Sequence, residues 1–213
     1  TGWRLETVGG INVSIHYGSD TNVIENNTIS GVRYGIFVSN GNYYNNEPVT
    51  VKNNSIGPII EIGIQNCQRC HIFDNTLTYN GEFTYFSDNT VGTGINVGYA
   101  EIHDNTISGF QTGIGLSNFN LVYHNTISNN NYGIQSWASS QVVHNNFVNN
   151  EQNQGNGSDF DKLDTYDWTE NSEVINSGNY WSDYSGICTD SDSDSICDDP
   201  YPFSGGTVNI EDN

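Results

Sequence analysis

Two short patterns recur along the chain, and they constrain its fold more than any other feature. An Asn followed by a polar and then an apolar residue recurs at Asn27, Asn54, Asn75, Asn105, Asn125 and Asn145. A Gly-Ile pair also recurs along the chain, beginning at Gly10, Gly35, Gly63, Gly94, Gly113 and Gly133. The last three Asn residues are 20 residues apart, and a fixed period of this length indicates a solenoid of stacked coils.

The residues around each Asn indicate short strands that stack in parallel. An apolar residue follows each Asn by two places, and an aliphatic residue precedes it by three: Ile24, Val51, Ile72, Ile102, Val122 and Val142. Equivalent strands of successive coils lie about 4.8 Å apart. The inward Asn amides can therefore bond one another along the stack, as side-chain ladders do. We interpret the Gly of each Gly-Ile pair as a turn position that needs an open backbone.

The period predicts an all-β protein, a right-handed parallel β-helix of about seven to eight coils. Residues 41–50 and 81–92 interrupt the period, so we expect them to form loops on a regular stack. An antiparallel sandwich is disfavoured, because it would show hairpin turns and no register of like residues. We expect the solenoid to span residues 1–180 and a closing segment to span residues 181–213.

Composition excludes several classes of partner. The 213 residues include 25 Asp and Glu but 5 Lys and Arg, which gives a formal net charge of −20. Nucleic acid is not expected as a partner, because phosphate binding needs clustered Lys and Arg, and polyanionic glycans meet the same field. No apolar run is long enough to cross a bilayer. The sequence contains no Met, and we expect it to be a processed part of an exported protein.

Three segments, IENNTISGVRYGIFVSN, IHDNTISGFQTGIGLSN and VYHNTISNNNYGIQSW, resemble the parallel β-helix repeats of NosD-type proteins and of carbohydrate-binding and sugar-hydrolase domains. The resemblance covers residues 10–150. The stretch GNYWSDYSGICTDSDSDSICDDPYPF resembles the closing segment of archaeal surface proteins of this type, although Ser193, Ser195 and Cys197 replace glycines common in that loop. The resemblance implies a secreted or cell-surface protein, but repeats alone specify little about activity.

An aspartate-rich loop in the closing segment has the spacing of a calcium site. Asp190, Asp192, Asp194 and Asp198 stand at alternating positions, and Ile196 lies between the last two. Alternate carboxylates in a tight loop converge on one point, and the carbonyl of Ile196 would be a further ligand. We therefore expect the loop to bind Ca²⁺ and not to be a solvated acidic segment.

The four cysteines form two local pairs in the sequence. Cys67 and Cys70 make a C-x-x-C, and Cys188 and Cys197 flank the aspartate-rich loop. In an exported protein they most simply form two local disulfides, although three pairings are possible and links between subunits stay open. Zinc is disfavoured because its ligands would come from two distant pairs. A redox role is disfavoured because no helix start is evident.

The residue just before each ladder Asn forms a second row, whose last four members are Asp74, Asp104, His124 and His144. Such a stripe can hold a metal or serve acid–base catalysis, so these are the catalytic candidates. The interpretation as a polar, solvent-facing corner is favoured, because no other face of the coil converges on them. His103 lies one residue earlier and is expected to face outward beside the stripe.

Sequons and aromatic residues supply further candidate sites. Sequons occur at Asn12, Asn26, Asn53 and Asn156, and Asn12 and Asn156 are the preferred glycosylation candidates, because the other two border the ladder. Aromatic residues lie in the two inserted loops and beside two Gly-Ile pairs: Tyr34, Tyr43, Tyr44, Phe83, Tyr85, Phe86 and Tyr132. They fit either a platform for sugar rings or a cover over the side of the helix.

Together these features favour a structural or adhesive envelope protein, such as a sheath, surface-layer or filament subunit. Stacking of copies end to end, or binding of other envelope proteins, would satisfy the strand edges at the ends of a β-helix. The alternative is a domain that binds or cleaves a polysaccharide, and cleavage would need an acid pair or a metal-activated base in a groove. A copper-handling role is not favoured, since Met and a dense His-Cys cluster are absent. We therefore lean against an enzyme.

Overall fold

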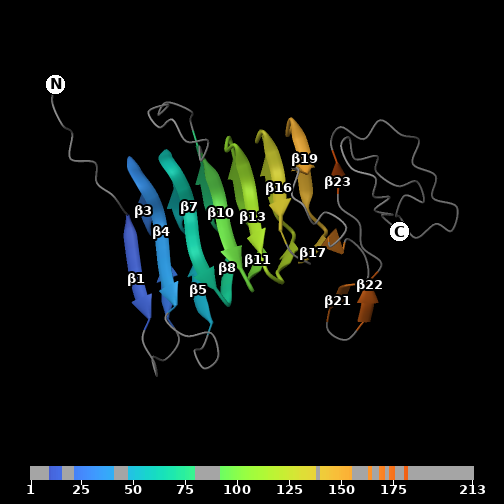
Figure 1. Ribbon diagram of the computed structural model, residues 1–213, viewed down its shortest axis with the longest axis horizontal. Helices are drawn as coiled ribbons and strands as arrows, with labels where there is room; N and C mark the ends of the chain where they lie inside the picture. The colour runs from blue at the N-terminus through green and yellow to red at the C-terminus, as the bar shows by residue number, and fades with distance from the viewer. Residues whose placement is uncertain are drawn as a thin grey trace, which may run out of the picture.

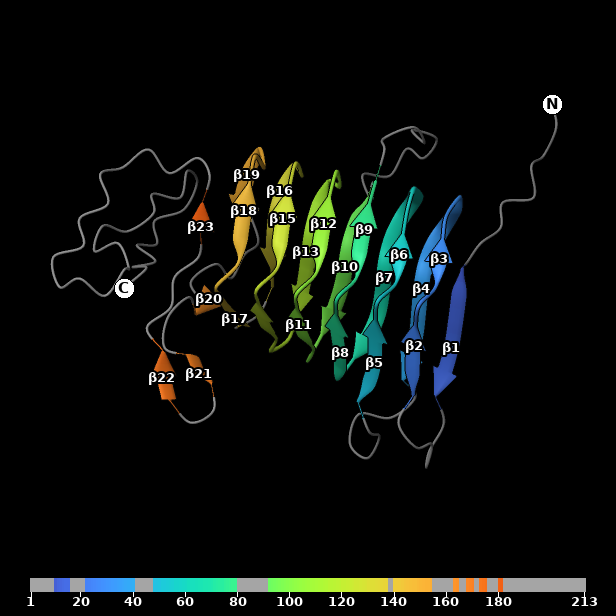
Figure 2. The same ribbon diagram turned by 180° about the vertical axis from the view of Figure 1, so that it is seen from behind.

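The computed structural model describes residues 10–15, 22–40, 48–79, 92–137, 140–154, 163–164, 168–170, 173–175 and 180–181. Within these ranges every regular element is a β-strand, and the strands form three parallel sheets and one antiparallel pair. Figures 1 and 2 show the coils stacked side by side, with β1 at one end and β19 and β23 towards the other. The chain is a right-handed parallel β-helix, which confirms the predicted fold.

Each coil contributes one strand to each of three seven-stranded sheets, which we call A, B and C. Sheet A contains β1 (Ile11–Ile15), β4 (Val32–Asn40), β7 (Ile59–Gln68), β10 (Thr93–Gly98), β13 (Thr112–Ser117), β16 (Tyr132–Ser136) and β19 (Gln152–Gln154). Sheet B contains β2 (Val23–Glu25), β5 (Val49–Lys52), β8 (Cys70–Phe73), β11 (Glu101–His103), β14 (Leu121–Tyr123), β17 (Ser140–Val143) and β20 (Leu163–Asp164). Sheet C contains β3 (Thr28–Ile29), β6 (Ser55–Ile56), β9 (Thr76–Thr78), β12 (Thr106–Ser108), β15 (Thr126–Ser128), β18 (Asn146–Val148) and β23 (Tyr180–Trp181). The antiparallel pair is β21 (Trp168–Glu170) and β22 (Glu173–Ile175).

The core consists of three aliphatic columns, one from each sheet. Ile95, Ile114 and Ile134 lie in register in sheet A. The aliphatic residue that precedes each ladder Asn by three places faces inward in sheet B, as Ile102 and Val122 illustrate. All five side chains are at most 1% exposed. A strand side chain repeats its direction every second residue, so one inward apolar position per short strand is enough to build a continuous core.

The predicted Asn ladder is present at the corner between sheets B and C. Asn105 Nδ2 donates a hydrogen bond to Asn125 Oδ1, and Asn125 Nδ2 donates to Asn145 Oδ1, both over 2.9 Å. Each buried amide also bonds backbone groups that the turn would otherwise leave unpaired, as Asn125 Nδ2 does with the carbonyl oxygens of Ile102 and Tyr123. The ladder therefore satisfies the polar backbone of a buried corner.

Apart from Gly10, which immediately precedes β1, the glycines of these Gly-Ile pairs lie inside strands of sheet A, so the interpretation of them as turn residues was wrong. Gly94 and Gly113 lie inside β10 and β13 of sheet A and are buried. A Cβ at Gly113 would stand 2.5 Å from the carbonyl oxygen of Gly133 and 2.8 Å from Ile127 Cγ2. The next coil approaches too closely for any side chain, and this close approach, not a positive φ, selects glycine.

The corner between sheets A and B is closed in two different ways. Cys67 and Cys70 form a disulfide there, as expected for a local pair, and both residues are fully buried. In later coils the position of Cys70 is taken by Ala100, Asn120 and Ser140, and Asn120 Oδ1 accepts a 2.9 Å hydrogen bond from the Ala100 backbone N–H. The disulfide in one coil thus occupies the position at which a hydrogen bond to Asn120 stabilises the same corner in a later coil.

The corner between sheets C and A carries a shorter Asn ladder. Asn130 Nδ2 donates to Asn150 Oδ1 over 3.0 Å. In an earlier coil, Tyr79 follows β9 at this corner and packs against Phe110, and burial raises the pKa of its hydroxyl. All three corners are therefore packed or hydrogen-bonded from within.

Several sequence predictions fall outside the described residues. They are the aspartate-rich loop with Asp190, Asp192, Asp194, Ile196 and Asp198, the pair Cys188 and Cys197, the sequon at Asn156, and the aromatic residues of the inserted loops. The described ranges contain no helix with the length and hydrophobicity to cross a membrane.

Candidate functional site

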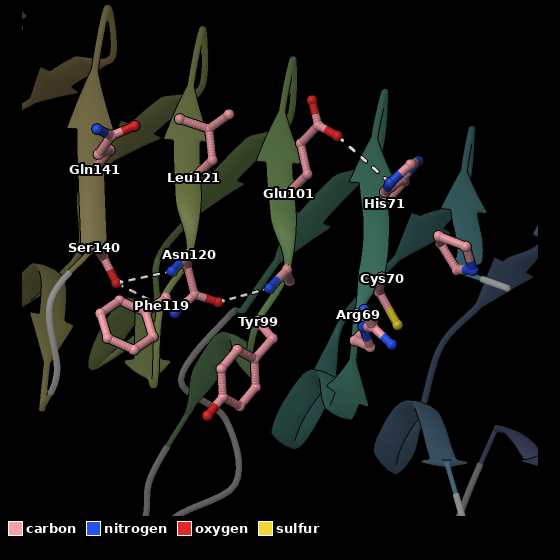
Figure 3. A pocket seen from close by; sticks show the side chains of 12 residues that line it. Arg69, Cys70, His71, Tyr99, Glu101, Phe119, Asn120, Leu121, Ser140 and Gln141 are labelled. Carbon is pink, nitrogen blue, oxygen red and sulfur yellow. Dashed lines mark hydrogen bonds and ion pairs between the residues drawn. The ribbon is translucent and has the colours of Figure 1, made fainter. Parts of the chain in front are cut away.

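A groove of about 680 Å³ lies over sheet B, at its corner with sheet A, and we call it the sheet B groove (Figure 3). Its lining forms three rows that run across the strands. The row on the outer face of sheet B contains His71, Glu101, Leu121 and Gln141. The row at the corner contains Cys70, Ala100, Asn120 and Ser140. The row on the rim contains Pro48, Arg69, Tyr99 and Phe119. The volume lies within the range of known ligand sites, about 300–1,000 Å³.

Two aromatic rings stand exposed on the rim of the groove. Tyr99 is 42% exposed and Phe119 is 65% exposed, and their ring centroids lie 6.3 Å apart on successive coils. Tyr99 adopts a φ of 54°, a left-handed conformation that is unusual for a bulky residue. Arg69 has the same φ of 54° at the equivalent position of the preceding coil, so this conformation belongs to the corner between sheets A and B. The rim therefore presents two partly exposed aromatic rings beside the groove.

Glu101 lies at the centre of the polar side of the groove. Its Oε1 accepts a 2.7 Å hydrogen bond from the Tyr123 hydroxyl, and its Oε2 lies 3.5 Å from His71 Nε2 (Figure 3 shows the His71 contact). The Tyr123 ring stacks on His103 with centroids 4.7 Å apart, and His103 stacks on Phe73 at 4.8 Å. This ring column braces Tyr123, and through it the carboxylate of Glu101, against rotation.

Charge in the groove differs from that of the whole chain. Arg69 lines the rim, whereas Arg33 and Lys52 pair elsewhere with carboxylates: Arg33 Nη2 lies 2.5 Å from Glu61 Oε1, and Lys52 Nζ lies 3.3 Å from Glu25 Oε2. Among the described lining residues, the formal charges of Arg69 and Glu101 cancel. The groove is thus close to neutral within a protein of net charge −20.

The predicted stripe lies at the other edge of sheet B, at the corner with sheet C. Asp74, Asp104, His124 and His144 each adopt a positive φ of 52–55°, because the chain turns sharply there before each ladder Asn. Asp104 Oδ2 lies 2.8 Å from His103 Nδ1, and Asp104 Oδ1 lies 4.0 Å from His124 Nδ1. The ring centroids of His124 and His144 are 5.6 Å apart. Asp74, in an earlier coil, is exposed. These candidates do not line the sheet B groove.

Sequence reasoning missed the groove because its residues share no motif. Glu101 stands four places before a ladder Asn, and Tyr99 and Phe119 stand six places before one. Alignment of the coils on the Asn ladder would have placed them in rows, but residue types change along each row. The Asn12 sequon lies in β1 and is exposed, whereas Asn156 lies beyond the described ranges.

Comparison with known proteins gives a match to a protein family. A family model described as "Periplasmic copper-binding protein (NosD)" matches residues 6–186. No curated protein and no solved structure matches the chain. The match covers more than half of the 213 residues.

Proposed function

The chain belongs to the NosD family, which is described as periplasmic, and we propose that this β-helix binds a saccharide chain in the sheet B groove. The description of the family as periplasmic supports a location in the cell envelope. The buried disulfide agrees with such a location, because disulfides persist in oxidising compartments. The observation that carries the proposal is the pair of exposed rings, Tyr99 and Phe119, opposite the fixed carboxylate of Glu101.

The chemistry of the groove suits a sugar polymer. Aromatic rings pack against the apolar C–H faces of sugar rings, and side chains with oxygen or nitrogen atoms bond the hydroxyl groups at the ring edges. Here the aromatic row and the row of His71, Glu101 and Gln141 lie on opposite sides of the groove (Figure 3). Both rows run across successive coils, so the groove is open to a chain that lies along the solenoid axis.

Loss of either aromatic ring should weaken binding to the groove. We expect Tyr99→Ala and Phe119→Ala each to lower the affinity for the bound polysaccharide about tenfold, which corresponds to about 1.4 kcal/mol. The measurement is affinity electrophoresis against a panel of soluble polysaccharides, followed by calorimetric titration of those that retard the protein. Trp137→Ala is the matched control, because Trp137 is 48% exposed but does not line the groove. Unchanged binding by a variant that combines Tyr99→Ala with Phe119→Ala would contradict the proposal. The absence of binding by the unaltered protein would contradict it as well.

The groove favours binding over cleavage. Glycoside hydrolysis normally requires two carboxyl groups that flank the scissile bond. Glu101 is the one carboxylate among the described residues that line the groove. Asp74 and Asp104 lie at the opposite edge of sheet B, so they do not supply its partner there.

Copper appears in the description of the family, but the described residues do not fit a resident copper site. In that part of the chain, no group of three or more His, Cys, Asp and Glu side chains is placed to hold a metal. His103 is stacked between two aromatic rings, and its Nδ1 already contacts Asp104. The possible metal ligands at the corner between sheets B and C lie in a row along the solenoid, so they do not surround a single metal position. No step of the proposed function passes through copper.

Assembly remains a second proposal, in which the protein is a sheath, surface-layer or filament subunit whose copies stack end to end. Within the described residues, β1, β2 and β3 are the terminal strands of their sheets, and each pairs with one neighbour. Such an edge is a template for another parallel strand. We further propose that Ca²⁺ bound by the Asp190–Asp198 loop stabilises the closing segment.

Electron microscopy with Ca²⁺ and then with a chelator tests assembly and calcium together. We expect filaments or sheets with Ca²⁺ and shorter species after chelation, because the closing segment would lose its cross-linking cation. The double variant Asp192→Asn with Asp194→Asn should behave in Ca²⁺ as the unaltered protein does in chelator. Monomers at high protein concentration, with Ca²⁺ and with chelator, would rule out end-to-end stacking. Thermal unfolding tests the calcium site separately, and equal melting temperatures with Ca²⁺ and with chelator would rule that site out.

A further inference from the structure

We infer that the sheet B groove selects uncharged sugar chains over polyuronates, and that Glu101 is the residue that determines this specificity. The inference rests on the proposed function and extends it to the class of ligand. Three observations support the specificity: the contacts of Glu101, the charges around Glu101 and the direction of the groove.

Glu101 is held in a fixed orientation with acceptor capacity to spare. The Tyr123 hydroxyl donates to Oε1 over 2.7 Å, and His71 Nε2 lies 3.5 Å from Oε2. An ionised carboxylate has about four lone-pair sites and donates no hydrogen bond. The Glu101 side chain is 34% exposed, so its remaining acceptor sites are open to the groove. They fit hydroxyl groups, which donate hydrogen bonds at the edge of an uncharged sugar.

A uronate would meet the wrong charges in this groove. Its carboxylate accepts hydrogen bonds and cannot donate one to Glu101, and two carboxylates in contact repel each other. Arg69 is the one Arg or Lys among the described lining residues, and a polyuronate carries a carboxylate on each sugar. The basic side chains of Arg33 and Lys52 are paired with carboxylates outside the groove. The net charge of −20 adds long-range repulsion of any polyanion.

The direction of the groove lets one sugar chain contact the aromatic rim and Glu101 together. The rings of Tyr99 and Phe119 come from successive coils, and Glu101 lies two residues after Tyr99 on the same coil. Successive coils are spaced about 4.8 Å apart along the solenoid. A linear chain along this axis therefore contacts the aromatic rim on one side and Glu101 on the other.

Equilibrium titration with uncharged and acidic polymers tests the specificity. The probes are soluble β-glucan, mannan and galactan on one side and polygalacturonate on the other, at low and at physiological salt. We expect at least one uncharged polymer to bind at least tenfold more tightly than polygalacturonate. Glu101→Gln should lower that affinity about tenfold, because a neutral amide is a weaker acceptor, and should narrow the gap to polygalacturonate. Glu151→Gln, an exposed residue outside the groove lining, makes the same change of net charge as a control.

Failure of this inference can be distinguished from failure of the proposed function. If binding depends on Tyr99 and Phe119 but polygalacturonate binds as tightly as the uncharged polymers, the specificity is wrong and the saccharide groove stands. The specificity is also wrong if Glu101→Gln and Glu151→Gln have the same effect on every polymer. If no polymer binds, or if binding ignores both rings, the groove is not a saccharide site and both proposals fall.

Discussion

Replacing Asn125 by alanine should lower the free energy of unfolding by about 3–5 kcal/mol, the largest effect that we expect from a single polar side chain. Asn125 is fully buried, and its side chain makes five hydrogen bonds. Alanine would leave the backbone N–H of Asn105 and the carbonyl oxygen of Ile102 without these partners inside the corner. Each buried polar group left unpaired costs about 1–3 kcal/mol.

Urea unfolding monitored by circular dichroism measures this effect, with Asn146→Ala as the matched control. Asn146 lies in β18 of the next coil and is exposed, so its loss should change stability by less than about 0.5 kcal/mol. A loss at Asn125 that is no larger than the loss at Asn146 would show that the ladder does not stabilise the solenoid.

The second large effect is expected from one added methyl group in sheet A. Gly113→Ala should destabilise the protein by about 3 kcal/mol, the upper part of the usual range for overpacking. The new Cβ would lie 2.5 Å from the carbonyl oxygen of Gly133, which belongs to the backbone of the next coil and cannot rotate away. The two strands would have to separate, and the strand pairing on that side would weaken with them.

Gly115 provides the control for this prediction within the same strand. Its nearest neighbours would lie 3.6 Å or more from an added Cβ, which is ordinary contact. Gly115→Ala should therefore be neutral or stabilise by about 0.5–1 kcal/mol, because alanine loses less conformational freedom than glycine in a strand. Thermal unfolding of Gly113→Ala and Gly115→Ala measures the difference in stability between them. Similar melting temperatures for the two variants would mean that the stack adjusts to the methyl group, and that close approach does not select glycine.

The candidate site was predictable only in part. The stripe of Asp104, His124 and His144 does lie in adjacent coils, because the ladder fixes the register of the residue before each Asn. The sheet B groove was not predicted, because Tyr99, Glu101 and Phe119 occur once each within rows that hold Leu, Gln or Pro in other coils. No spacing rule marks such residues before the curvature of the coil is known.

The sequence by itself determined the β-helix, its register and its core. An apolar residue three places before each Asn and another two places after it can be buried together only if the coils stack in parallel. Tertiary structure decided the rest. Gly113 is glycine because of a carbonyl group in the next coil, and Glu101 is held by Tyr123, which is 22 residues away. Contacts between coils depend on how two backbones approach, and that distance is set by the packed stack and not by either segment alone.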